Sequence, residues 1–164
     1  MATAGDLEGS GLLAIDLGLR TGIARFGADG RLVAYRSQHF GSRAALRRGA
    51  LRVLREWGLP TVLVLEGGSY AEAWQRAAGR VDVAVRTTTA EVWRERLLTP
   101  AQRRDAVRAK AAAERHAREV IAAAGLPRPH SLRHDAAEAS CLGDWAVAEG
   151  LGGARGWAER AAGS

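Results

Sequence analysis

The chain has 164 residues, of which 47% are hydrophobic and 26% are charged, and this is enough to bury the core of one ordinary domain. No apolar run approaches the roughly 18 residues of a membrane-spanning helix, and no signal-peptide pattern opens the sequence, so we expect no membrane association. The formal net charge of +6 indicates a polyanionic partner, most often a nucleic acid. The single cysteine, Cys141, excludes an intrachain disulfide and favours a cytoplasmic location.

The first part of the chain predicts an antiparallel meander. Residues 1–11 are expected to be a disordered lead-in. The stretch 12–17 is apolar apart from Asp16 and predicts a buried strand. The segments TGIARF (21–26) and RLVAYR (31–36) flank the hairpin signal GADG, so we expect two further strands joined by a tight turn.

The remainder predicts helices with two further strands between them. The segment TVLVLE (61–66) is almost entirely apolar, which is typical of a strand covered on both faces, and VDVAV (81–85) is expected to be a fifth strand. The predicted helices are 42–57, capped by Ser42, then 69–78, 89–98, 100–124 and 134–149. The tryptophans expected in the core are Trp57, Trp74, Trp93 and Trp145. Together these elements predict one α/β domain over residues 12–149, followed by a flexible tail, 150–164.

Four carboxylates lie at positions that indicate a functional role. Asp16 interrupts a buried strand, where an unpaired carboxylate is costly, and Glu66 ends the fourth strand. Asp135 and Glu138 are three residues apart and share a face of the last helix. Side by side, the four groups would repel one another, and a pair of Mg²⁺ or Mn²⁺ ions would remove that repulsion. Two such ions can hydrolyse a phosphodiester, although each acid taken alone could equally be a surface or capping group.

Three segments in this order, AIDLGLRTGIA, VLVLEGG and RHDAAEA, resemble the RuvC-type Holliday-junction resolvases of the RNase H-like superfamily. The resemblance extends over about residues 12–149. The segment TTTAEVWRERLL and the basic helix after it are more similar to the phage and chloroplast branch. The resemblance implies an RNase H-like fold, an α/β fold with a five-stranded mixed sheet flanked by helices. It also implies a homodimer that nicks four-way DNA junctions symmetrically, with two Mg²⁺ (or Mn²⁺) ions per active site and no small-molecule cofactor.

The same resemblance implies roles for individual residues. Asp16, Glu66, Asp135 and Glu138 fall on the catalytic metal-binding positions of the family, although most bacterial members have aspartate where this chain has Glu138. Lys110 matches a basic catalytic position and is the only lysine among 24 basic residues. An ammonium group retained in so arginine-rich a chain would suit a phosphate contact, and chance is the alternative. His134 adjoins the acids and is expected to be a helix-start residue that faces solvent.

DNA contacts are expected in three places. Arg20 and Thr21 lie in the turn GLRTG, where backbone amides could approach a phosphate, or where glycine simply permits a tight turn. Tyr70 lies where relatives present an aromatic ring to the junction centre, so it could stack on a base or pack in the core. Residues 94–118 contain eight basic and three acidic residues. The predicted DNA-binding residues of that segment are Arg94, Arg103, Arg104 and Arg108.

Two other functions remain open on the sequence alone. An RNA-processing nuclease of the YqgF type shares the opening motif, and cleavage of structured RNA rather than a DNA junction would identify it. A junction-binding protein without catalytic activity is the second alternative, and failure to bind Mn²⁺ would identify that one. For the dimer interface, the helix that follows the meander and the last helix are both candidates.

Overall fold

The computed structural model describes residues 10–153, in which five strands form one mixed sheet in the order β3-β2-β1-β4-β5. The strands are β1 (Leu12–Asp16), β2 (Arg20–Phe26), β3 (Leu32–His39), β4 (Val62–Glu66) and β5 (Ala84–Thr88). The first three form the predicted antiparallel meander, and β4 lies parallel to both β1 and β5. The prediction was wrong about where β5 begins, because Asp82 adopts a left-handed φ of 54° and residues 80–82 form a turn.

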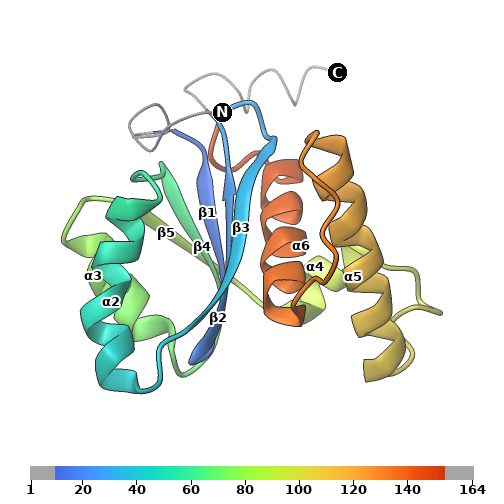
Figure 1. Ribbon diagram of the computed structural model, residues 1–164, viewed down its shortest axis with the longest axis horizontal. Helices are drawn as coiled ribbons and strands as arrows, with labels where there is room; N and C mark the ends of the chain where they lie inside the picture. The colour runs from blue at the N-terminus through green and yellow to red at the C-terminus, as the bar shows by residue number, and fades with distance from the viewer. Residues whose placement is uncertain (1–9, 154–164) are drawn as a thin grey trace.

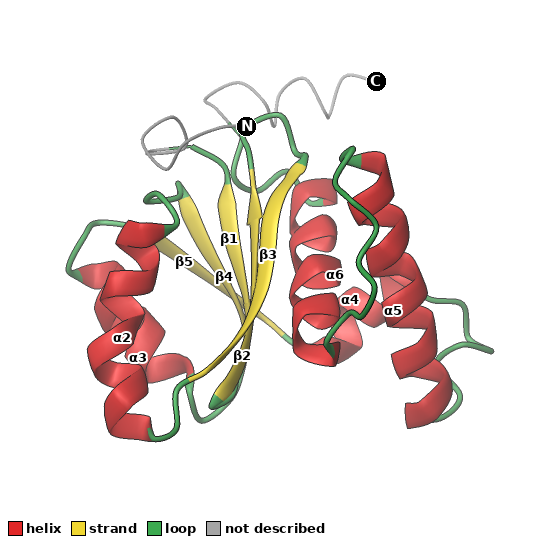
Figure 2. Ribbon diagram, viewed as in Figure 1, coloured by secondary structure: helices red, strands yellow, loops and turns green. Residues whose placement is uncertain are grey.

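Helices cover both faces of the sheet (Figures 1 and 2). On one face lie α2 (Arg43–Glu56) and α3 (Ala71–Gly79), and on the other lie α4 (Ala90–Leu97), α5 (Ala106–Ala123) and α6 (His134–Ala148). The Ser42 side chain caps α2 as predicted, by accepting a hydrogen bond from the amide of Ala45. The start predicted for α5 at Pro100 was wrong. Asp105 caps this helix instead, through a hydrogen bond from the amide of Arg108, and a separate turn precedes it.

The central strand β1 is buried on both sides because alternate side chains enter two different cores. Leu12 and Ala14 pack in the core beneath α4, α5 and α6, whereas Leu13 and Ile15 pack in the core beneath α2 and α3. The predicted burial of the tryptophans is confirmed at three positions and only partial at the fourth. Trp74, Trp93 and Trp145 are buried, and Trp57 is half-buried.

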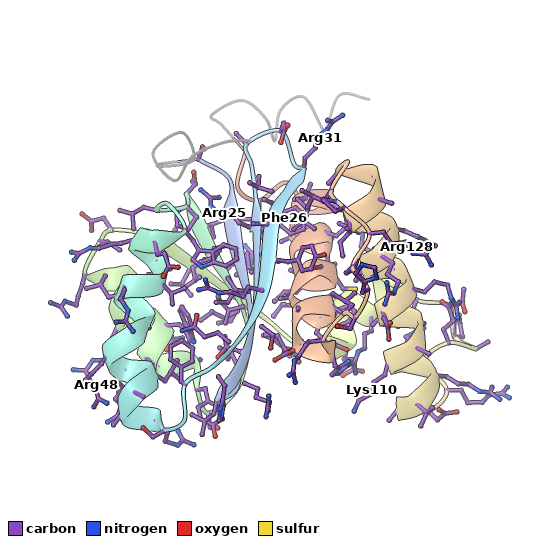
Figure 3. All side chains as sticks on the ribbon, in the orientation of Figure 1. Arg25, Phe26, Arg31, Arg48, Lys110 and Arg128 are labelled. Carbon is purple, nitrogen blue, oxygen red and sulfur yellow. The ribbon has the colours of Figure 1, made fainter. Side chains whose placement is uncertain are left out.

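Small side chains allow α6 to lie close against the sheet. A side chain at Gly143 would collide with the ring of Phe26, which lies on the face of β2 opposite its neighbour Arg25 (Figure 3). Cys141 is fully buried, as expected, and its thiol donates to the carbonyl of Ala113. Most of α6 is therefore covered within its own domain.

The ends of the described chain join the same core. Gly11 accepts a hydrogen bond from the amide of Thr61, and Leu151 donates its own amide to the carbonyl of Ala146. Residues 1–9 and 154–164 of the expected lead-in and tail lie outside the described residues. Within residues 10–153, no helix is both long and apolar enough to cross a membrane.

Candidate active site

Asp16 and Glu66 end neighbouring parallel strands. The register pairs Ile15 with Leu65, so the two acids are the next residues along β1 and β4. Backbones of paired strands lie about 4.8 Å apart, which brings the two carboxylates to one edge of the sheet. This is the carboxyl edge of the parallel strands, where ligands gather in α/β sheets.

The start of α6 reaches the same edge because residue 22 is a glycine. Asp16 pairs with Gly22 across the ladder between β1 and β2. A Cβ atom at Gly22 would overlap the carbonyl group of Asp135 and lie 3.0 Å from the amide nitrogen of Ala136. Only a residue without a side chain lets the helix approach this closely. Gly22 thus carries a packing role beyond the tight turn expected from the sequence, and it brings Asp135 beside Asp16.

Electrostatic repulsion links the four acids to one another. Burial, followed by repulsion from Glu66, Glu138 and Asp135, raises the pKa of Asp16 to about 8 from an ordinary value of 3.8. Arg94 acts in the opposite direction. Burial also raises the pKa of Glu138, again opposed by Arg94. A strand-end carboxylate with such a raised pKa is characteristic of a functional site.

Two hydrogen bonds fix the orientation of acids at this edge. The indole Nε1 of Trp93, on α4, donates to Oε2 of Glu66 at 2.9 Å. The hydroxyl of Ser37, on β3, donates to Oδ2 of Asp135 at 2.6 Å. Sequence reasoning placed Trp93 in the core but missed its polar contact, and it missed Ser37 entirely, because both pairs join segments distant in the chain.

Glu138 is held by two basic side chains. Its side chain is 4% exposed, and its Oε1 atom lies 2.9 Å from Nη2 of Arg94 on α4. Nε2 of His134, one turn earlier on α6, lies 3.4 Å from the same oxygen. His134 is exposed, as expected, yet it also contacts the acidic site. Arg94 is therefore part of the acidic site in this structure, although the sequence indicated only a DNA contact.

The donor set suits a divalent cation. As the side chains stand, no three Asp, Glu, His or Cys residues among those described converge closely enough to hold a metal ion. The chemistry nevertheless fits, because four mutually repelling carboxylates offer the hard oxygen ligands that Mg²⁺ and Mn²⁺ prefer. Arg94 donates to Oε1 of Glu138, so a cation that coordinates this oxygen would have to displace the guanidinium.

The residues predicted to meet DNA outside the basic segment differ in accessibility. Arg20 is exposed at the start of β2. Thr21 is fully buried and its hydroxyl donates to the carbonyl of Gly18 at 2.7 Å. That burial places its side chain out of reach of a DNA strand and favours the tight-turn interpretation. Tyr70 is half-buried at the N-cap of α3, and the guanidinium of Arg43 lies 4.3 Å from the centre of its ring.

Three of the predicted arginines line one cavity. Arg94, Arg103 and Arg104 line a space of about 460 Å³ between α4 and the start of α5, together with the carboxylates Glu91 and Asp105. Arg108 is exposed nearby and lies 3.4 Å from Asp105. Lys110 is exposed on α5, and none of the ion pairs within residues 10–153 joins it to the acids (Figure 3).

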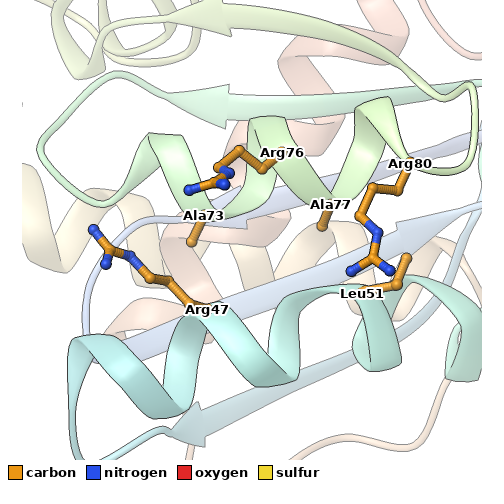
Figure 4. A pocket seen from close by; sticks show the side chains of 6 residues that line it. All are labelled: Arg47, Leu51, Ala73, Arg76, Ala77 and Arg80. Atoms are coloured by element: carbon orange, nitrogen blue, oxygen red, sulfur yellow. The ribbon is translucent and has the colours of Figure 1, made fainter.

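A second basic groove lies in the other helix layer (Figure 4). It measures about 260 Å³ and is lined by Arg47 of α2 and by Arg76 and Arg80 of α3, with Leu51, Ala73 and Ala77. Its lining contains no carboxylate and no nucleophile, so it offers charge for an anion but no means of hydrolysis. The acidic edge formed by β1, β4 and α6 is therefore the candidate active site.

Comparison with known structures finds the same fold in RuvC of Thermus thermophilus. The structure of T. thermophilus RuvC in complex with Holliday junction substrate matches with a TM-score of 0.61 and 15% identity, over 83% of this chain and 91% of that chain. A second T. thermophilus RuvC structure matches with a TM-score of 0.55 and 17% identity, over 85% of this chain and 96% of that one. No family model and no curated protein sequence matches the chain. The expected five-stranded mixed sheet flanked by helices is confirmed as the fold that these RuvC structures share.

Proposed function

We propose that the protein is a divalent-metal-dependent endonuclease that resolves four-way DNA junctions by paired, symmetric nicks. The observation that supports this proposal is that β1, β4 and α6 bring Asp16, Glu66, Asp135 and Glu138 to the same edge of the sheet. The shared fold supports it, since one of the similar proteins was captured in complex with a Holliday junction substrate. The net charge of +6 and the basic cavity beside the acids supply attraction for DNA.

The four acids would hold the cations, which the proposal takes to be two Mg²⁺ or Mn²⁺ ions per active site. The chemistry that such ions supply when bound is activation of a water molecule and neutralisation of charge at the phosphodiester. The chain itself holds the carboxylates in fixed positions. Asp16 and Glu66 extend from paired strands, and the indole of Trp93 and the hydroxyl of Ser37 hold two of the carboxylates in place. The products of this reaction would be a 3′-hydroxyl and a 5′-phosphate.

Symmetric resolution requires two active sites, so the proposal includes a homodimer. Of the two helices considered for its interface, α2 remains, since its outer face is exposed whereas α6 is buried. Kinship with the phage and chloroplast branch rests on the α4 segment and on Lys110, which we propose contacts a phosphate at the reacting centre. A chain with one buried cysteine suits the cytoplasm, where we place the reaction.

Cleavage of synthetic DNA tests the proposal. Purified protein with Mg²⁺ should cut a four-way junction at paired positions and leave a linear duplex of the same sequence intact. Asp16→Asn should abolish cleavage while junction binding persists. Asp29→Asn is the matched control, because Asp29 is exposed in the hairpin between β2 and β3 and asparagine keeps the oxygen that caps this turn. Full activity of Asp16→Asn, or cleavage of structured RNA in preference to the junction, would overturn the proposed reaction.

A further inference from the structure

The ion pair between Arg94 and Glu138 is unusual for a site that must bind cations. Glu138 is almost fully buried, with 4% of its side chain exposed, whereas 29% of the Arg94 side chain reaches solvent. An uncompensated carboxylate at such a position is strongly unfavourable. In this structure, Arg94 therefore acts as the counter-ion of Glu138, and a cation that coordinates Oε1 of Glu138 must compete with it.

The guanidinium of Arg94 also borders a cavity in which it could bind a different anion. Arg94 also lines the cavity of about 460 Å³ that it shares with Arg103 and Arg104, and the buried Nε atom of Arg94 has no hydrogen-bond partner among the described residues. The lining also contains the carboxylates Glu91 and Asp105, so the three guanidinium groups leave it with a net positive charge. Such a lining attracts a phosphate, which arginine binds through paired hydrogen bonds. A DNA phosphate in this cavity would offer Arg94 a partner of the same charge as Glu138.

The helix that carries Arg94 is anchored independently of it. Trp93 is fully buried and bonded to Glu66, and Thr89 caps the first turn of α4 through the amide of Val92. The guanidinium of Arg94 also lies 5.1 Å from the centre of the Trp93 ring. Transfer of Arg94 to the cavity would therefore give up this cation–π contact together with the ion pair, while Trp93 keeps its own hydrogen bond to Glu66.

We propose that Arg94 is an exchangeable counter-ion, which neutralises Glu138 in the free protein and transfers to a DNA phosphate in the cavity lined by Arg103 and Arg104. The transfer frees Glu138 for a divalent cation, so the cation site is completed only when DNA is bound. This inference rests on the proposed function, because it assumes that the acidic edge binds cations and that the substrate is DNA. In this role Arg94 is a positioning residue that prevents binding of metal, and hence cleavage, before the substrate arrives.

Thermodynamic linkage makes the inference measurable. If DNA removes the competitor of the cation, then DNA must tighten cation binding, and the cation must tighten DNA binding by the same factor. Coupling between sites typically amounts to about 5- to 150-fold in affinity. The measured quantity is the affinity for Ca²⁺, determined by isothermal titration calorimetry with and without a synthetic four-way junction. The junction is checked on a gel to be intact after the titration.

Wild-type protein and three variants distinguish the exchange of Arg94 from a general effect of removing one positive charge. Wild-type protein should bind Ca²⁺ more tightly with the junction than without it. Arg94→Gln should bind Ca²⁺ tightly even without DNA and lose most of the coupling, while Arg94→Lys should keep part of it. Arg96→Gln removes the same charge from the same helix, where Arg96 pairs instead with the exposed Glu149, and should behave as wild type. Thermal unfolding verifies that each variant is folded.

Several results would refute the exchange. If wild-type protein bound Ca²⁺ with equal affinity with and without the junction, this result alone would refute the exchange. Coupling that survives in Arg94→Gln, or that falls equally in Arg96→Gln, would show that Arg94 holds no special position. Failure of the proposed function has a different signature, namely no Ca²⁺ binding by any of the proteins, or no binding of the junction.

Discussion

Gly22 offers a direct test of how the site is assembled, because the start of α6 packs on its bare backbone. In Gly22→Ala the new methyl group would overlap the carbonyl of Asp135 and crowd the amide of Ala136, and backbone atoms cannot move aside as a flexible side chain can. Overpacking of this kind costs about 1–3 kcal/mol, and we expect a value near the upper end. For a domain of this size, roughly 2–4 °C of melting temperature correspond to each kcal/mol, so a fall of about 6–12 °C is expected.

Activity should suffer beyond the loss of stability. Displacement of α6 carries Asp135 and Glu138 away from Asp16, and a misplacement of about 1 Å at a reacting centre can cost about 100-fold in rate. The assays are thermal unfolding by circular dichroism and junction cleavage at a temperature where the variant remains folded. Gly79→Ala serves as the control, since a methyl group at this helical position meets nothing within 4 Å. It should lower neither readout, and alanine can raise the melting temperature slightly through its helix propensity. If Gly22→Ala matched this control in both, the packing argument would be refuted.

Three further outcomes are expected. Without metal, Asp16→Asn should melt at a higher temperature than wild type, because the pKa of Asp16 is raised from 3.8 to about 8 and asparagine carries no charge. The difference in melting temperature should be absent below about pH 4 and should widen towards pH 8. A difference that stays constant with pH would contradict this. His116 lies 2.7 Å from Asp144, and this hydrogen bond raises its pKa. The stability it contributes is complete below about pH 6.5 and declines as pH rises through the raised pKa, so Asp144→Asn should lower the melting temperature more at pH 5.5 than at pH 9. Lys110→Met should reduce cleavage by roughly 100-fold or more with an unchanged melting temperature, and unimpaired cleavage would remove Lys110 from the reaction.

Elements specified by local signals were the predictable part of the fold. The meander depends on the hairpin GADG and on apolar strands that flank it, and the first helix depends on the Ser42 cap, so both follow from short segments. The start of β5 was not predictable from its apolar residues, because this edge strand is largely exposed and its composition reflects little burial. At α5, the Asp105 cap prevails over the proline that the sequence presents five residues earlier.

In the candidate site, too, the residues marked by a local pattern were predictable and the contacts between distant segments were not. Asp16 and Glu66 stood out because a carboxylate in a buried strand is anomalous in any local window. The contact of Arg94 with Glu138 joins residues 44 positions apart, and that of Ser37 with Asp135 joins residues 98 positions apart. Such contacts depend on how α4 and α6 cross the sheet, which no short pattern in the sequence encodes.

The burial of α6 has a consequence for the order of events during translation. This helix fills the centre of one core and carries two of the four acids, yet it follows every strand and every other helix of the described chain. Ribosomes add about 5–20 residues per second, so α6 is synthesised several seconds after the strands whose apolar face it covers. An unfinished polypeptide would have half of the acids and an open apolar face, so under the proposed function it could not cut DNA before its synthesis reached this helix.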